Sequence, residues 1–211
     1  HRQRIWALAG IPKVQTDESD PLYQNSTERV RLPDIVDSAI FVAKEIRPSP
    51  EIVRGILHKG AKMVIGGGSK SFKTWVQLDL GISISYGIKW LGFDTLPGKV
   101  LFVNFEIQEE FFQQRIKKID ESRGITLEEG RLDVWNLRGK SASYHLIIPQ
   151  IMERIKDSNY VLCILDPVYK LYGKTDENSA SDVAQLLNAF EGLTVDTGSA
   201  VGFGAHYSKG N

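Results

Sequence analysis

Residues 66–74 read Gly-Gly-Gly-Ser-Lys-Ser-Phe-Lys-Thr, and this stretch decides the fold. It follows the phosphate-loop pattern G-x-x-x-x-G-K-[ST], with Gly67 in the first position and Lys73 and Thr74 in the last two. Glycines let successive backbone N–H groups turn inward around an anion, and the N-terminus of the following helix adds partial positive charge. Lys73 would lie between the β- and γ-phosphates of ATP, and the Thr74 hydroxyl would bind Mg²⁺. The predicted nucleotide-binding residues are Gly66, Gly67, Gly68, Ser69, Lys70, Ser71, Phe72, Lys73, Thr74 and Trp75.

One position departs from this pattern, because Phe72 replaces the second glycine. A bulky residue there must adopt a backbone angle that glycine adopts easily, or the loop must differ slightly in shape. Lys70 either contacts a second phosphate or is simply solvated. The alternative to a nucleotide site is a glycine-rich turn into a helix that binds nothing.

The chain beyond residue 60 alternates short apolar runs with longer amphipathic stretches. The runs 62–65, 100–105, 132–137, 161–165 and 200–205 predict strands, and residues 73–87, 109–124, 145–157 and 181–197 predict helices. The strands are continuously apolar, as a sheet covered on both faces requires. The predicted fold class is therefore α/β, with a mainly parallel sheet and helices on both faces.

Polar residues follow three of these predicted strands, at the edge of the sheet where ligands bind in open α/β folds. Asp166 ends an apolar run in the Walker B pattern and would hold Mg²⁺ with Thr74, although a turn cap is the alternative. Glu106 ends another run and is the predicted general base or water-orienting group, with Glu109 and Glu110 as competitors that better suit the first turn of a helix. His206 ends the last run and would either sense the γ-phosphate or serve a structural role.

Composition and length set the remaining limits. The chain has 211 residues, 42% of them hydrophobic, and 26 basic residues balance 26 acidic ones, so overall charge does not indicate nucleic acid. The single cysteine, Cys163, lies inside an apolar run, and one cysteine is too few for a disulfide framework or a cysteine-based zinc site.

The chain has two predicted parts. Residues 1–50 are predicted to be an arm or linker, with helical spacing over 34–46, and residues 51–211 to be the core. No apolar stretch is long enough to span a membrane, so the expected compartment is the cytoplasm.

Several segments together resemble a known family. These are MVIGGGSKSFKTW (63–75), WLGF (90–93), VLFVNFE (100–106), LDP (165–167), DENS (176–179) and HYSKGN (206–211). At this spacing they resemble the RecA-like AAA family ATPases related to the plasmid hexameric replicative helicase RepA, over about residues 45–211.

The resemblance implies a role for each matching residue. Glu106 corresponds to the catalytic glutamate, Asp166 to the Walker B aspartate and His206 to the polar sensor, while Lys209 lies where related hexamers project a basic residue toward a neighbour's nucleotide. It also implies that an aromatic residue before the loop lysine is tolerated, and that the core continues beyond Asn211. Such rings bind ATP between subunits and thread single-stranded DNA.

Three functions fit these residues. The first is a Mg²⁺-dependent, ring-forming ATPase, self-assembled as a hexamer and acting on single-stranded DNA as a helicase or DNA replication factor. The second is a P-loop kinase, although no arginine-rich lid is visible, since Arg115, Arg123, Arg131 and Arg138 are scattered. The third is a nucleotide-gated assembly protein with little turnover. A GTPase is disfavoured because no Asn-Lys-x-Asp motif occurs.

Overall fold

Five strands form one parallel sheet in residues 48–211. They are β3 (Lys62–Gly67), β4 (Lys99–Asn104), β5 (Leu132–Asn136), β6 (Tyr160–Asp166) and β7 (Ala200–His206), in the order β3-β7-β6-β4-β5. Every neighbouring pair is parallel. The computed structural model describes residues 32–140, 143–173 and 180–206. The parallel sheet in it confirms the predicted α/β class.

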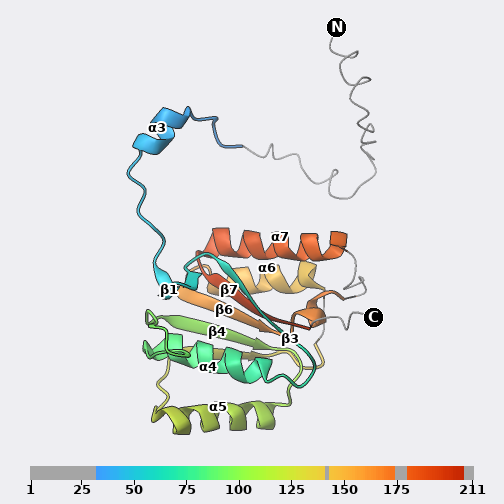
Figure 1. Ribbon diagram of the computed structural model, residues 1–211. Helices are drawn as coiled ribbons and strands as arrows, with labels where there is room; N and C mark the ends of the chain where they lie inside the picture. The colour runs from blue at the N-terminus through green and yellow to red at the C-terminus, as the bar shows by residue number, and fades with distance from the viewer. Residues whose placement is uncertain (1–31, 141–142, 174–179, 207–211) are drawn as a thin grey trace. The chain divides into compact units, whose positions relative to one another are not determined.

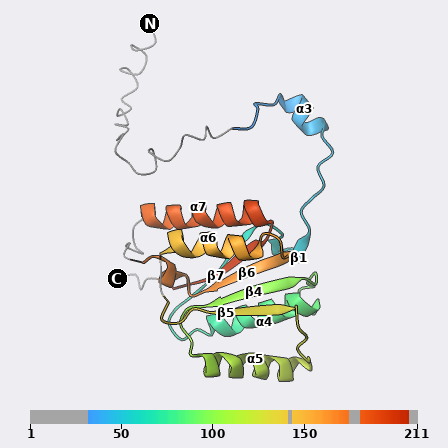
Figure 2. The same cartoon turned by 180° about the vertical axis from the view of Figure 1, so that it is seen from behind.

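Helices cover both faces of this sheet (Figures 1 and 2). α4 (Lys73–Tyr86) and α5 (Glu109–Arg123) pack on one face, and α6 (Tyr144–Ile155) and α7 (Ala180–Thr197) on the other. β6 shows why its sequence is continuously apolar: Leu162 and Ile164 belong to the core under α4, whereas Cys163 and Leu165 belong to the core under α6 and α7. Cys163 is completely buried in this core, and the burial raises the pKa of its thiol to about 12.

A small hairpin and a short 3-10 helix complete the core unit. β1 (Glu51–Val53) pairs antiparallel with β2 (Leu57–His58), and its buried residues join the core under α4. The backbone N–H of Leu96 donates to the carbonyl of Ile52 at 3.0 Å and ties the hairpin to the segment between α4 and β4. The 3-10 helix η1 (Val168–Leu171) follows β6 directly. Strands of two or three residues carry too little periodicity to predict, so the hairpin is an addition to the expected elements.

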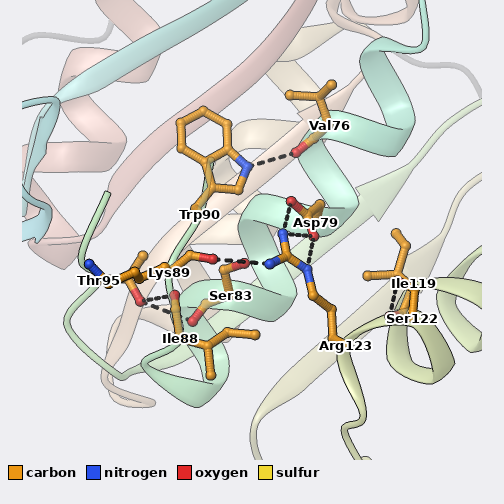
Figure 3. Close-up of polar contacts among 10 residues, drawn as sticks. All are labelled: Val76, Asp79, Ser83, Ile88, Lys89, Trp90, Thr95, Ile119, Ser122 and Arg123. Carbon is orange, nitrogen blue, oxygen red and sulfur yellow. Dashed lines mark hydrogen bonds and ion pairs between the residues drawn. The ribbon is translucent and has the colours of Figure 1, made fainter. Parts of the chain in front are cut away.

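A polar clamp joins α4, α5 and the segment that follows α4 (Figure 3). The Arg123 guanidinium at the end of α5 donates to both carboxylate oxygens of Asp79 on α4, with Nη2 2.6 Å from Oδ2 and Nε 2.9 Å from Oδ1. Arg123 also donates to the Lys89 carbonyl at 3.2 Å, and the Trp90 indole donates to the Val76 carbonyl at 3.4 Å. Because α4 begins at the phosphate loop, this clamp fixes α5 relative to the loop.

The chain divides into residues 1–47 and 48–211. In the first part the structure describes one helix, α3 (Ser38–Ala43), which begins where the Asp37 carboxylate accepts a hydrogen bond from the Ala39 N–H at 2.8 Å. Lys44 is extended, so the helix is shorter than the predicted span of 34–46. None of its residues is buried, and a helix this short has little stability of its own. Among the described residues, no helix combines the length and apolarity that crossing a bilayer demands.

Candidate nucleotide site

The phosphate loop leaves β3 and ends where α4 begins at Lys73. Phe72 adopts the left-handed conformation, with φ 60° and ψ 17°, and Lys70 has φ 61°. Phe72 thus takes the backbone angle of the glycine it replaces, at a cost of about 1 to 2 kcal/mol. Its side chain is 71% exposed, so the bulky ring does not crowd the loop. Phe72 therefore changes the side chain at this position of the motif but preserves the backbone conformation of the loop.

Lys73 holds its ammonium group inside this loop. Its Nζ donates to the carbonyls of Gly67 at 2.9 Å and Gly68 at 2.7 Å, and lies 3.4 Å from the Ser71 hydroxyl oxygen. The Ser71 hydroxyl in turn donates to the Gly68 carbonyl at 2.8 Å. All these acceptors are neutral oxygens of the loop itself. The lysine charge is therefore enclosed by the segment that would surround a phosphate.

Asp166 lies at the end of β6 directly beside the start of α4. The Thr74 hydroxyl donates to Asp166 Oδ2 at 2.5 Å, and the Gln77 amide donates to Oδ1 at 2.7 Å. Burial raises the pKa of Asp166, and the nearby Glu106 charge raises it further, while Thr74, Gln77 and Lys73 oppose the shift. The side chain is 4% exposed. A buried carboxylate and a hydroxyl held together present the hard oxygen donors that Mg²⁺ prefers.

Glu106 lies in the turn between β4 and α5, and Asn104 holds that turn in place. Asn104 is buried, and its Oδ1 accepts hydrogen bonds from the N–H groups of Glu106 at 3.2 Å and Ile107 at 2.9 Å. Its Nδ2 donates to the Ile107 carbonyl at 2.8 Å and to Asn136 Oδ1 at 3.0 Å. The Glu106 side chain is exposed toward the site, whereas Glu109 and Glu110 occupy the first turn of α5, as predicted.

One cavity of about 590 Å³ gathers most of the predicted residues. Residues 69–75 line it, together with Glu106, Asp166 and three residues that sequence reasoning did not select, Ile107, Arg115 and Pro167. The predicted Gly66, Gly67 and Gly68 do not line it. Gly66 and Gly67 belong to β3, and the carbonyls of Gly67 and Gly68 accept hydrogen bonds from Lys73. Arg115 and Gln77 lie within helices, and their sequence pattern does not distinguish them from other helix residues. Only the tertiary structure shows that they reach the site.

A family model described as an AAA domain matches residues 26–211 of the chain. The chain belongs to the AAA domain family. No curated protein matches it. Membership in this family, together with the five-stranded parallel sheet and the loop at its edge, makes this protein a P-loop ATPase of the AAA type.

Two further predicted residues of this AAA domain lie near or beyond the limit of the described structure. β7 lies between β3 and β6, and its register sets His206 opposite Gly67, so the backbone of His206 reaches the same sheet edge. The side chain of His206, all of Lys209 and the segment 176–179 are outside the described residues. Their roles stay predictions.

Gly204 of this AAA domain lies directly against the Asp166–Gln77 pair. A Cβ at Gly204 would lie 2.6 Å from Asp166 Oδ1 and 2.7 Å from Gln77 Nε2, closer than real Cβ atoms approach. We expect Gly204→Ala to break the Asp166–Gln77 pair, to lower stability by about 1 to 3 kcal/mol and to weaken Mg²⁺-nucleotide binding. Thermal unfolding and calorimetric titration measure both effects.

Gly202 is the matched control, two residues earlier on the same face of β7. A Cβ there would meet Ile164 and Leu162 at 3.7 Å, an ordinary contact. Gly202→Ala should therefore bind nucleotide like the unmodified chain. Equal nucleotide affinity in the two variants would show that the Asp166–Gln77 pair does not support the site.

Proposed function

We propose that this AAA domain hydrolyses ATP with Mg²⁺ at the cavity between the phosphate loop, Asp166 and Glu106. The observation that carries the proposal is the convergence of a phosphate-loop lysine, a buried carboxylate–hydroxyl pair and an exposed glutamate on one cavity. Fold alone would not support this activity, because one fold serves many functions. The proposal therefore rests on the chemistry of these side chains.

Each group has a distinct role in this proposal. Lys73 and the loop N–H groups bind the β- and γ-phosphates, and Glu106 accepts a proton from the attacking water or orients it. Thr74 and Asp166 would hold Mg²⁺, which neutralises charge on the phosphates. The fit of these two residues to the ion rests on their direct 2.5 Å contact and their oxygen donors.

We further propose that the ATPase works as a ring-forming motor on single-stranded DNA, as a helicase or a helicase-related replication protein. Support comes from the resemblance to RepA-type ATPases at the residues of the site. Steady-state ATP hydrolysis should rise when single-stranded DNA is added, and the stimulation should fall as salt increases, because contacts to phosphates release counterions. An ATP turnover rate that does not change when DNA is added would instead favour a kinase or another partner. Nucleotide-dependent assembly without turnover would favour the gated assembly protein.

The N-terminal arm, residues 1–50, allows a test of ring formation. Its described part exposes large apolar side chains on and around α3, at Ile35, Ile40, Phe41, Val42 and Ile46. Exposed apolar clusters of this kind mark interaction surfaces, and we propose that this one binds a neighbouring copy. Deleting residues 1–46 should reduce the mass of the ATP-bound assembly, measured by light scattering, to that of a monomer or dimer. An unchanged mass would contradict a role for the arm in assembly.

A further inference from the structure

Gln77 is a polar residue buried within α4. Only 1% of it is exposed, and Leu78 and Leu80 of the same helix are completely buried apolar residues. Its amide nitrogen donates to Asp166 Oδ1 at 2.7 Å and lies 3.5 Å from the Lys73 carbonyl oxygen, which is longer than an ordinary hydrogen bond. The contact with Asp166 is therefore the stronger of the two bonds that the structure describes for this amide.

The other end of the same amide has no partner in the part of the chain that the structure describes. Gln77 Oε1 is buried, and no donor among residues 32–140, 143–173 and 180–206 reaches it. A buried acceptor without a donor costs free energy, and an apolar residue of similar size would avoid that cost. Packing alone therefore does not account for a glutamine at this position, whereas its bond to Asp166 does.

α4 provides a hydrogen-bond donor for each oxygen of the Asp166 carboxylate. Thr74 and Gln77 stand three residues apart, which places them on the same face of the helix. Thr74 donates to Oδ2 at 2.5 Å, and Gln77 donates to Oδ1 at 2.7 Å. Thr74 lines the cavity and is itself a proposed Mg²⁺ ligand, whereas Gln77 does not line it. Gln77 can therefore fix the carboxylate without itself contacting a nucleotide or an ion.

The backbone of β7 encloses this pair from the sheet. A Cβ at Gly204 would lie 2.6 Å from Asp166 Oδ1 and 2.7 Å from Gln77 Nε2, so the two bonded atoms fill the space where a side chain of β7 would stand. Close packing on this side leaves the carboxylate little room to turn while Gln77 holds it. Three elements thus fix the orientation of one acid, which lies beside the phosphate loop.

We propose that Gln77 is a positioning residue of the Mg²⁺-nucleotide site, which fixes the Asp166 carboxylate so that Oδ2 stays directed toward Thr74. Residues that hydrogen-bond to metal-binding side chains orient them, and their loss typically lowers metal affinity by about ten- to a hundredfold. This inference rests on the proposed function. It adds a residue that acts on the ion only through Asp166 and makes no contact with ATP.

The test measures how strongly Mg²⁺ improves nucleotide binding. Calorimetry gives the dissociation constant of a non-hydrolysable ATP analogue for the full chain in EDTA and in Mg²⁺, and the ratio of these two constants is the Mg²⁺ coupling. Gln77→Met keeps the approximate size of the side chain but removes the donor. It should lower the coupling about tenfold or more and leave the affinity in EDTA within about twofold, because Lys73 and the loop are unchanged.

A double-mutant cycle shows whether Gln77 acts through Asp166. In the Asp166→Asn background no carboxylate is left to position, so adding Gln77→Met should change the Mg²⁺ coupling by less than about twofold. A residue that only packs the helix would instead cause the same loss in both backgrounds. The cycle therefore separates a positioning role from a purely structural one.

Ser83→Ala is the matched control, because Ser83 is another buried residue of α4 with an unpaired side-chain oxygen in the described structure. It lies further along the helix, where its carbonyl accepts a hydrogen bond from the Thr95 hydroxyl at 3.0 Å (Figure 3). This variant should keep the Mg²⁺ coupling of the unmodified chain. Gln77→Asn is a second variant, which keeps a buried amide but is one methylene shorter. Because its donor no longer reaches Asp166, the coupling should fall as it does in Gln77→Met.

Other outcomes separate this inference from the proposed function. Equal losses of affinity in Mg²⁺ and EDTA, no loss in either, or the same loss in the Asp166→Asn background would overturn the role of Gln77. If Asp166→Asn loses the Mg²⁺ coupling while Gln77→Met and Gln77→Asn keep it, the proposed Mg²⁺ site stands and the role of Gln77 falls. If Mg²⁺ does not improve nucleotide binding by the unmodified chain, both proposals fall together.

Discussion

Lys73→Ala is expected to reduce steady-state ATP turnover by on the order of 10² to 10³. Lys73 is 8% exposed, and its ammonium donates to the carbonyls of Gly67 and Gly68, so the loop positions this charge before any phosphate arrives. The alanine variant lacks this cation, which is already in position when negative charge develops on the phosphates and does not have to move. Phosphate release at saturating ATP and Mg²⁺ measures the loss.

Lys117→Ala is the control for this prediction, because Lys117 is an exposed lysine of α5 that does not line the cavity. We expect it to retain most of the turnover, and thermal unfolding should show that both variants fold. Turnover in Lys73→Ala within about threefold of the unmodified chain would contradict the assignment of the phosphate loop, since a preorganised donor contributes far more than that.

Glu106→Gln is expected to keep ATP binding while reducing hydrolysis by about 10² or more, as loss of a positioned base predicts. The change is confined to the carboxylate, because Asn104 holds the turn through the backbone N–H groups of Glu106 and Ile107. Glutamine is of similar size but does not accept a proton at neutral pH. Calorimetry with ATP and single-turnover hydrolysis separate binding from chemistry.

Glu110→Gln provides the comparison, since Glu110 is an exposed acid in the first turn of α5. It should hydrolyse ATP at close to the normal rate. Should turnover survive in Glu106→Gln and fall in Glu110→Gln or Glu109→Gln, the base has been assigned to the wrong acid.

The main elements of the core were predictable because their sequence signals match their physical surroundings. Continuous apolar runs such as 161–165 mark strands covered on both faces, and β6 buries alternate residues in two cores. The loop between β3 and α4 was predictable from its glycines and from the Lys73-Thr74 pair. Because the carboxyl ends of parallel strands share one edge, Asp166 and Glu106 could be expected at the same site as the loop.

The rest depends on packing that one-dimensional patterns do not encode. The hairpin β1–β2 is held by its burial and by a hydrogen bond to Leu96, and its strands are too short for periodicity. Gln77 and Arg115 look like ordinary helix residues until α4 and α5 bring them to Asp166 and Trp75. The helix predicted over 34–46 is shorter in the structure, Ser38–Ala43, because the chain is already extended at Lys44.

The most direct measurement of the central claim is calorimetric binding of a non-hydrolysable ATP analogue, with Mg²⁺, to the unmodified chain and to Lys73→Ala. We expect one nucleotide per chain for the unmodified protein and at least about a tenfold loss of affinity in the variant, as removal of a charged contact to phosphate implies. No binding by the unmodified chain, or equal binding by both, would contradict the assignment of the cavity between the phosphate loop, Asp166 and Glu106 as a nucleotide site.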